Sequence, residues 1–339
     1  MMDNLIWVAL NFLRGKKYGE QLIAAALEQF SNGKEVAVPI SKDDYKKAKR
    51  EVELSQKKGF KVITIDSEEY PKQLRNIKDP PIVIYIKGNI VKSDEKAISI
   101  VGSRKCTVYG RSTAETFAKE LASKNITIVS GLAMGIDTAS HKGALAAKGR
   151  TIAVLGSGLD RIYPSCNKDL YREIAKSGAV ISEFPLGTPP FSYNFPFRNR
   201  IISGLSIATL VVEAAEHSGS LITARLAAEQ GREVFAIPGN ITSNTSKGTN
   251  QLIKDGAIPV TDVNDILEYL GMDTEQNKKE LPLSDEEKAV LEVMDNGAKT
   301  AETIAKETGI APSKLVSLLT YMEVKGFIKR VAGRFTKIL

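Results

Sequence analysis

Gly102, Ser103 and Arg104 follow an apolar stretch at 97–101 and combine a flexible backbone, a hydroxyl group and a guanidinium group. A glycine lets backbone amides approach a ligand closely, and a guanidinium can bind phosphate oxygens through two parallel hydrogen bonds. The next helical pattern begins only after Gly110, so we expect these residues in the turn that leaves a buried strand. We interpret the turn as a phosphate-binding site. The alternative is an ordinary strand-to-helix turn with an arginine on its surface.

A second glycine-containing turn lies at 130–137, with the sequence Ser-Gly-Leu-Ala-Met-Gly-Ile-Asp. Gly131 and Gly135 would let the backbone approach a ligand, and the N-terminus of the helix that follows favours an anion. Asp137 fits the role of a helix cap almost equally well. His141, in the middle of the expected helix, is more typical of a packed or bridging side chain than of a catalyst.

A third turn, with Gly156, Ser157 and Gly158, ends another apolar stretch. Its Gly-x-Gly pattern is not completed to Gly-x-Gly-x-x-Gly, because Arg161 occupies the sixth position. A Walker A loop is absent from the sequence as well, so the evidence for a nucleotide-binding fingerprint is weak. Asn167 and Lys168 follow and add polar and cationic groups.

The segment 184–197 is rich in proline and aromatic residues and runs directly into Arg198, Asn199 and Arg200. Rings that stack on bases, together with cations that hold phosphates, are typical of surfaces that bind single-stranded nucleic acid. The alternative is a buried aromatic loop whose arginines bond to carbonyl groups at strand ends. For the aromatic residues, this alternative is as good an explanation as nucleic-acid binding. For the two arginines, it is the weaker explanation.

Ser218, Gly219 and Ser220 precede another helical pattern and offer amides and hydroxyl groups. A serine–histidine hydrolase is disfavoured, because no Gly-x-Ser-x-Gly elbow is present and the adjacent pair His217–Ser218 has poor geometry for proton transfer. No His-Glu-x-x-His motif or paired-carboxylate signature occurs either. The motifs therefore indicate a binding protein rather than an enzyme.

The elements that must position these turns alternate between strand and helix. Strands are expected at 97–101, 126–129, 151–155, 179–182, 207–213, 233–237 and 257–260, with helices at 112–123, 136–148, 168–176, 221–229 and 248–254. Continuous apolar strands separated by helices predict an α/β fold with an extended Rossmann-like, doubly wound and mainly parallel sheet. Ligands of such sheets bind outside the carboxyl ends of the strands, which is where the glycine and serine residues lie.

Both ends of the chain predict separate domains. Residues 1–65 form a helical domain, with helices at 5–13, 20–30 and 43–58, and residues 66–270 form the Rossmann-like domain. A polar linker at 271–283 leads to a domain at 284–339. Its three expected helices, at 285–294, 301–308 and 312–325, and a hairpin predict a winged helix. The last helix carries few basic residues, which slightly favours a protein contact over DNA reading.

Composition excludes several classes of protein. The 339 residues carry a formal net charge of +7, and the excess lies in the first 270 residues. A modest positive charge is compatible with a polyanionic partner. No apolar run is long enough to span a bilayer and no signal peptide is visible, so we expect no membrane association. With only two cysteines and two histidines, we expect a cytoplasmic protein without disulfide bonds, metal or cofactor.

Six segments occur in an order that resembles the bacterial DNA-processing protein A (DprA/Smf) family. They are Ile-Val-Gly-Ser-Arg at 100–104, the turn at 130–137, Gly-Ser-Gly-Leu-Asp at 156–160 with Tyr163-Pro164, Phe-Arg-Asn-Arg-Ile-Ile-Ser-Gly-Leu-Ser at 197–206, Val-Glu-Ala at 212–214 with Ser-Gly-Ser-Leu-Ile-Thr-Ala at 218–224, and Phe-Ala-Ile-Pro-Gly-Asn at 235–240. The resemblance is strong over about 66–260. Members often carry an N-terminal sterile-alpha-motif-like domain and a C-terminal winged helix, which fits both ends of this chain.

The resemblance implies a non-catalytic protein that binds single-stranded DNA, protects incoming strands and loads the RecA recombinase during natural transformation, the DNA uptake of competent cells. It also implies a homodimer, with a single-stranded-DNA-binding protein as a further partner. Carried onto this sequence, Arg104 is the main phosphate contact, and the loops at 156–168 and 198–200 extend the basic pocket. Many relatives have a cation after the Tyr-Pro pair, whereas this chain has Ser165. Arg161 and Lys168 are the nearest replacements.

Two other functions remain open. A nucleoside-phosphate hydrolase on the same kind of sheet would use Glu213 and Arg198, a carboxylate and a guanidinium that could act on a ribose phosphate. A winged-helix transcription regulator with a metabolite-sensing core would bind duplex DNA through residues 280–339. Base release from nucleotides would indicate the first, and sequence-specific duplex binding the second.

Overall fold

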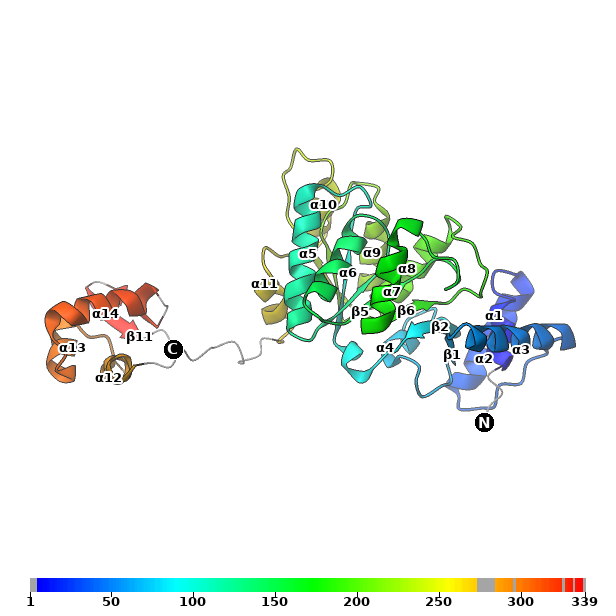
Figure 1. The fold of residues 1–339 in the computed structure, drawn as a ribbon, viewed down its shortest axis with the longest axis horizontal. Coiled ribbons are helices and arrows are strands. Elements are labelled where there is room, and N and C mark those ends of the chain that lie inside the picture. The colour runs from blue at the N-terminus through cyan, green and yellow to red at the C-terminus, as the bar shows by residue number, and fades with distance from the viewer. Residues whose placement is uncertain (1–4, 273–283, 295–296, 325–326, 332, 338–339) are drawn as a thin grey trace. The chain divides into compact units, whose positions relative to one another are not determined.

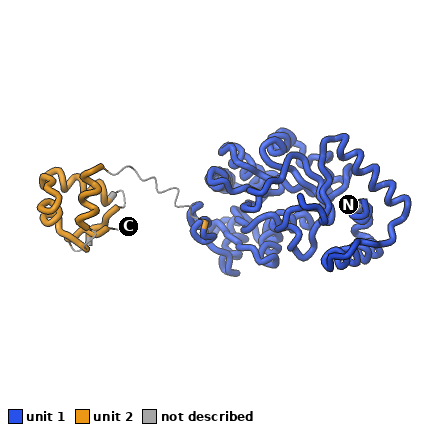
Figure 2. Tube along the Cα trace, turned by 90° about the horizontal axis from the view of Figure 1, so that it is seen from below, with its two compact units in different colours: residues 1–271 blue, residues 272–339 orange. Residues whose placement is uncertain are grey.

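The computed structural model describes residues 5–272, 284–294, 297–324, 327–331 and 333–337. The chain divides into a unit of residues 1–271 and a unit of residues 272–339 (Figures 1 and 2). From residue 273 onwards, the linker predicted at 271–283 lies outside the described residues.

A nine-stranded sheet forms the centre of the first unit, in the order β1-β2-β6-β5-β4-β3-β7-β8-β9. Its strands are β1 (Lys61–Thr64), β2 (Val83–Gly88), β3 (Ala97–Val101), β4 (Thr127–Ser130), β5 (Thr151–Val154), β6 (Ala179–Ser182), β7 (Ala208–Val211), β8 (Glu233–Ala236) and β9 (Ile258–Pro259). Pairing is parallel from β6 to β9 and antiparallel between β1, β2 and β6. The predicted doubly wound, mainly parallel sheet is confirmed.

The strand order reverses between β3 and β7, which are adjacent although far apart in sequence. All residues of β3, β4, β5, β6 and β7 are buried, as expected for strands covered on both faces. The buried hydroxyl groups of Ser99 and Thr209 bond to each other across β3 and β7 at 2.7 Å. This reversal point is the usual position of a ligand site in a doubly wound sheet.

Helices connect the parallel strands. They are α5 (Val108–Ser123), α6 (Ile136–Ala146), α7 (Lys168–Ser177), α8 (Asn194–Gly204), α9 (Gly219–Glu229), α10 (Lys247–Lys254) and α11 (Val263–Tyr269), with short turns α4 (Lys72–Arg75), η1 (Lys92–Glu95) and η2 (Ser165–Asn167). Helix α6 packs on α5 and α7, while α8 packs on α9 (Figure 1). The close approach of α6 to α5 requires Gly143, because a Cβ atom there would lie 2.2 Å from the Glu115 carbonyl oxygen.

Arg198, Asn199 and Arg200 lie in helix α8, and not in a loop as the sequence had predicted. The buried side of this helix is largely polar, so it lacks the apolar spacing that marks a helix. Pro196 lies in its first turn, where a helix tolerates proline. Helices α4 and α11 were also not predicted, and α5 begins at Val108, four residues earlier than expected.

The N-terminal helices pack onto the same core as the sheet. They are α1 (Leu5–Asn11), α2 (Lys17–Ser31) and α3 (Lys42–Lys57), and Trp7 and Leu10 of α1 share a core with Ile84 of β2. Strand β1 lies within the range predicted as a helical domain, and it pairs with β2 in the large sheet. Residues 1–65 are therefore joined to the Rossmann-like sheet, and the boundary at residue 65 stays a prediction.

The second unit contains α12 (Asp285–Met294), α13 (Ala301–Thr308) and α14 (Pro312–Val324), followed by strands β10 (Ile328–Val331) and β11 (Arg334–Lys337). The two strands form an antiparallel hairpin. The hydroxyl group of Thr300 caps α13, and Gly309 ends that helix with a positive φ of 72°. A separate core includes Val290, Ile304 and Leu319. The predicted winged helix is confirmed.

Among the residues that the structure describes, no helix is both long and apolar enough to cross a membrane. Within the same residues, no group of three or more histidine, cysteine, aspartate or glutamate side chains is arranged to hold a metal ion.

Candidate nucleic-acid interface

A cavity of about 780 Å³ lies at the carboxyl ends of β3 and β7, where the strand order reverses. Its walls come mainly from the turn after β3, the turn after β4, Tyr163 in the connection after β5, helix α8 and the N-terminus of α9. Of the residues expected to bind phosphate, eight line this cavity: Gly102, Ser103, Arg104, Arg198, Asn199, Ser218, Gly219 and Ser220. The fold thus brings together segments that are far apart in the sequence.

An exposed cation and two aromatic rings form one wall of the cavity. The Arg104 guanidinium carbon lies 4.9 Å from the centre of the Phe195 ring, and the Tyr163 ring lies 5.6 Å from Phe195. Arg104 is exposed, and Tyr163 keeps 45% of its surface accessible. A guanidinium beside one half-buried ring and one exposed ring can hold a phosphate while a base stacks next to it. We call these three residues the Arg104 cluster.

The turn after β3 is held by hydrogen bonds to the segments that follow β7 and β4. The Ser103 amide donates to the Glu213 carbonyl oxygen at 2.7 Å, and its own carbonyl accepts from the Ile136 amide at 3.2 Å. Gly135 has a positive φ of 81°, and a Cβ atom there would lie 2.3 Å from the Ser103 carbonyl oxygen. Gly135 therefore serves the close packing of the two turns, and it does not line the cavity.

Arg198 lies at the cavity but is almost fully buried, with 3% of its surface exposed. Its guanidinium donates to the carbonyl oxygens of Gly131, at 3.0 Å, and of Val154. Burial lowers the pKa of Arg198 to about 10, although the charge of the Asp137 carboxylate acts to raise it. Burial also raises the pKa of the Asp137 carboxyl group, although the charge of Arg198 acts to lower it. The structure therefore shows the alternative interpretation of Arg198, in which its guanidinium bonds to carbonyl groups at strand ends.

Ser218, Gly219 and Ser220 start helix α9 at the cavity. The Ser218 hydroxyl group accepts from the Ser220 amide at 3.4 Å, so it caps the helix. Asn199 of α8 donates from its side chain to the Gly219 carbonyl oxygen at 3.3 Å. This bond ties α8 to α9 at the cavity wall.

The turn after β5 does not line the cavity. Asn194 donates to the Gly156 carbonyl oxygen at 3.0 Å, the Gly158 amide donates to Thr188, and the Ser157 hydroxyl group donates to the Arg161 carbonyl oxygen. These bonds stabilise the turn itself. A role in phosphate binding for this turn stays a prediction.

The residues that follow this turn differ in exposure. Arg161 and Lys168 are exposed and lie outside the cavity lining. Asn167 is buried and donates to the Leu132 carbonyl oxygen and to the Thr138 hydroxyl group, both at 2.9 Å. Asn167 therefore joins η2 to the segment after β4, and its amide nitrogen is already engaged.

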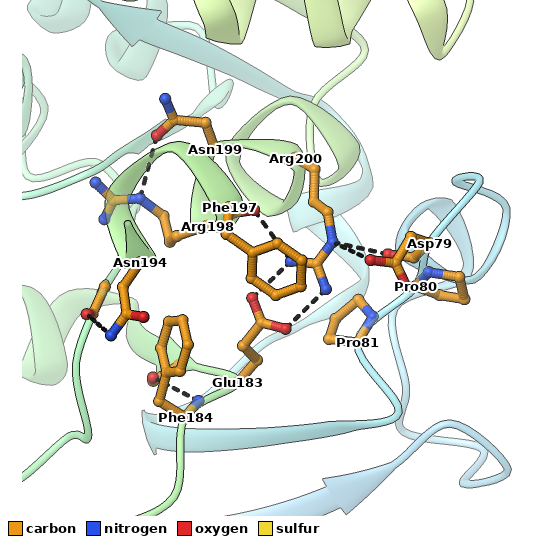
Figure 3. A network of polar contacts seen from close by, with 12 residues as sticks. Asp79, Pro80, Pro81, Glu183, Phe184, Asn194, Phe197, Arg198, Asn199 and Arg200 are labelled. Carbon is orange, nitrogen blue, oxygen red and sulfur yellow. Dashed lines mark hydrogen bonds and ion pairs between the residues drawn. The ribbon is translucent and has the colours of Figure 1, made fainter. Parts of the chain in front are cut away.

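Arg200 does not line the cavity, and its side chain points toward Glu183 and Asp79 (Figure 3). Its guanidinium forms a buried ion pair with Glu183, with distances of 2.5 and 2.7 Å from its two terminal nitrogens to the carboxylate oxygens. This placement differs from the sequence-based role of Arg200 as a phosphate ligand.

Several residues of the cavity were not among the expected phosphate ligands: Lys105, Tyr163, Phe195 and Thr245. The sequence offered a signal for three of them, since Lys105 follows Arg104 directly, Tyr163 belongs to the Tyr-Pro pair and Phe195 lies in the aromatic segment 184–197. Thr245 follows β8 in a polar loop without any distinguishing pattern, so no signal in the sequence could have found it.

The Glu213 carboxylate, suspected in a hydrolase, is engaged in a structural role. Its oxygens accept from the Thr107 amide at 2.8 Å and from the Thr107 hydroxyl group at 2.6 Å. Thr107 is the N-cap of α5, and Glu213 is only 4% exposed. The pair anchors the start of α5 to the end of β7, beside a second hollow of about 650 Å³.

His141 is fully buried in α6, where its Nδ1 atom lies 2.7 Å from the Thr151 hydroxyl oxygen. That hydroxyl group donates to the Ile128 carbonyl oxygen, so Nδ1 is the donor of the first bond. Burial, together with the charge of Arg198, lowers the pKa of His141 to about 3. His141 is thus a neutral packed side chain, in agreement with the sequence-based interpretation.

The sheet, the cavity at its reversal point and the C-terminal unit define a Rossmann-like protein with an attached winged helix. Two protein-family models match the sequence, and together they identify the family. The model of DNA recombination-mediator protein A matches residues 61–271, and that of the DprA winged helix domain matches residues 274–334. The chain belongs to the DNA recombination-mediator protein A (DprA/Smf) family.

Individual relatives agree with this assignment. Protein Smf of Escherichia coli is 42% identical over 290 residues, which are 82% of this chain and 77% of that protein. The DNA processing protein DprA of Bacillus subtilis is 44% identical over 227 residues, 67% of this chain and 76% of that protein.

Two solved structures are also similar. DprA of Streptococcus pneumoniae has a TM-score of 0.68 and 36% identity, covering 78% of this chain and 97% of that one. DprA of Helicobacter pylori, described for its single-stranded DNA binding mode, has a TM-score of 0.57 and 32% identity, covering 63% and 96%.

Proposed function

We propose that this protein binds single-stranded DNA at the cavity after β3 and β7, without catalysing a reaction on it. The observation that carries the proposal is the Arg104 cluster, which places an exposed guanidinium 4.9 Å from one ring and an exposed second ring beside it. A duplex keeps its bases stacked inside, whereas a single strand can offer both a phosphate and a free base face to this cluster. The Helicobacter pylori relative, described as a single-stranded DNA binder, supports the same ligand.

The finer role follows from family membership. We propose that the protein protects incoming single strands and loads RecA onto them during natural transformation, acting as a homodimer in the cytoplasm. A single-stranded-DNA-binding protein would be a further partner. No site residue is assigned to RecA or to the dimer interface.

The neighbouring site chemistry favours binding over hydrolysis. Thr107 engages both oxygens of Glu213, and Arg198 donates to two backbone carbonyl groups, so the two residues suspected in a hydrolase already serve the fold. Release of a base from nucleotide monophosphates, abolished by Glu213→Gln, would contradict the non-catalytic proposal.

The direct test compares labelled single-stranded and duplex oligonucleotides of one sequence by fluorescence anisotropy, at several salt concentrations. We expect tighter binding of the single strand, with an affinity that falls as salt rises. Equal or tighter binding of the duplex would overturn the proposal. Adding RecA to the pre-bound single strand tests loading: faster filament growth than on bare DNA supports it, and unchanged growth contradicts it.

A further inference from the structure

Helix α8 has two functional sides, which Figure 3 shows around one turn of the helix. Arg198 and Asn199 lie on the side that lines the cavity. Phe197 and Arg200 lie on the opposite side, toward Glu183 and the loop at 79–81. Whatever holds the second side also sets the position of the first, because a helix moves as a rigid element.

The donors of Arg200 are almost all engaged within the protein. Besides its two bonds to Glu183, it donates from Nε to the backbone and carboxylate oxygens of Asp79, at 2.9 and 3.2 Å. A further bond runs from Nη1 to the Phe197 carbonyl oxygen at 3.2 Å. Burial acts to lower the pKa of Arg200, but the charge and hydrogen bonds of Glu183, together with the charge of Asp79, raise it. Arg200 therefore stays charged and holds α8 rather than DNA.

The N-terminal helices take part in the same network. Arg14, just after α1, lies 3.3 Å from the Asp79 carboxylate and 4.0 Å from that of Glu183. Asn11, at the end of α1, donates from its side chain to the Glu183 backbone oxygen at 2.9 Å. The N-terminal segment thus touches the acidic groups that hold Arg200.

The Phe197 ring adds an apolar contact to these ion pairs. The guanidinium carbons of Arg200 and Arg14 lie 4.0 and 5.5 Å from its centre. One ring of α8 therefore contacts a cation from its own helix and a cation from the N-terminal segment. The strength of a cation–ring contact depends on where the cation lies relative to the ring. A shift of either arginine would therefore change the contacts that hold α8.

We infer that Asp79 and Glu183, held by Arg14 and Arg200, are positioning residues for DNA binding. They couple the N-terminal helices to the cavity through α8, although none of these four residues lines the cavity. The inference deepens the proposed function and rests on it. It predicts that weakening the network lowers the affinity for single-stranded DNA without removing a contact to a phosphate.

Asp79→Asn is the decisive variant, because simple electrostatics and the inference predict opposite signs. The side chain of Asp79 is 48% exposed, so the variant is expected to fold, which a melting curve checks. Loss of a negative charge should by itself strengthen binding of a polyanion. The inference instead predicts affinity weakened by about three- to ten-fold, a usual size for an effect transmitted through packed neighbours.

Glu53→Gln is the matched control for charge, since Glu53 is an exposed acidic residue on α3. It should leave affinity unchanged or slightly increased. If Asp79→Asn behaves like this control, the inference is wrong, while the proposed function stands. If the wild-type protein fails to bind single-stranded DNA, both the proposed function and the inference that rests on it are wrong.

Arg14→Ala gives a second measurement with a distinct readout. A positioning residue should weaken binding yet leave the slope of log affinity against log salt unchanged, because no phosphate contact is lost. Arg14→Lys should restore part of the affinity. A reduced slope for Arg14→Ala would mean that Arg14 itself contacts DNA and would overturn the positioning role. Lys47→Ala, which removes an exposed cation from α3, controls for the lost charge.

Discussion

Each of the two buried arginines of α8 has an acidic partner inside the protein. Arg198 faces Asp137 and two backbone carbonyls, and Arg200 faces Glu183. Removing one partner of such a pair would leave a buried charge without compensation, which typically costs about 3–5 kcal/mol. Arg104, in contrast, is exposed and stacks on Phe195. At the residue scale, the cations of the cavity lining that a ligand can reach, Arg104 and Lys105, therefore differ from Arg198 in exposure rather than in charge.

His141 makes the stability of the protein depend on pH. Its folded pKa of about 3 lies below the ordinary value of 6.5, so protons bind preferentially to the unfolded chain. The contribution is fully present above pH 6.5 and is lost as pH falls from 6.5 toward 3. Between pH 7 and 5.5 we expect a decrease of about 1 kcal/mol in the free energy of unfolding.

Chemical denaturation at these two pH values measures the effect. His141→Gln should remove the decrease, whereas His217→Gln, at an exposed histidine, should keep it. A decrease of equal size in all three proteins would assign the pH dependence to other groups.

At the scale of elements, the start of helix α5 depends on one threonine. Thr107 caps the helix through the Gly110 amide at 3.0 Å and donates to buried Glu213. Thr107→Ala should lower the free energy of unfolding by about 2–3 kcal/mol, since a cap and a partner of a buried carboxylate are both lost. Ser41→Ala, at the exposed cap of α3, should cost only about 1 kcal/mol. Equal losses in denaturant melts would contradict the anchoring role of Glu213.

The sequence predicted β3, β4, β5, β6 and β7 well because each is a mainly apolar run that is buried on both faces. It failed at α8, where packing replaces the apolar stripe with polar side chains such as Arg198 and Asn199 that bond inside the protein. Periodicity reports apolar burial and cannot report a buried ion pair. The same limit explains Arg200, whose partner Glu183 lies on another element and has no sequence signal.

For the cavity, the sequence singled out the turn with Gly102, Ser103 and Arg104, which lines it, because the carboxyl ends of parallel strands share one edge. It could not separate the turns that line the cavity from the one at 156–158, whose polar groups bond to Arg161, Thr188 and Asn194. That distinction depends on tertiary contacts, which only the fold reveals.

At the scale of the whole molecule, the two units have separate cores, one built around the sheet and one around Ile304 and Leu319. The cavity lies entirely within residues 1–271. A protein ending at residue 271 should therefore keep its affinity for single-stranded DNA within about two-fold, since no cavity residue is removed. Anisotropy titrations of both lengths measure this. A loss of ten-fold or more would mean that the winged helix contributes to single-strand binding.

The central claim is that exposed Arg104, stacked on Phe195, is the phosphate ligand of a single-stranded DNA site. Its most direct test is the affinity of Arg104→Ala for a single-stranded oligonucleotide across a salt series, with Arg225→Ala, at an exposed arginine of α9, as the charge-matched control. We predict several-fold weaker binding for Arg104→Ala alone, with a salt slope reduced by about one phosphate contact. An affinity and a slope equal to those of the control would contradict the account.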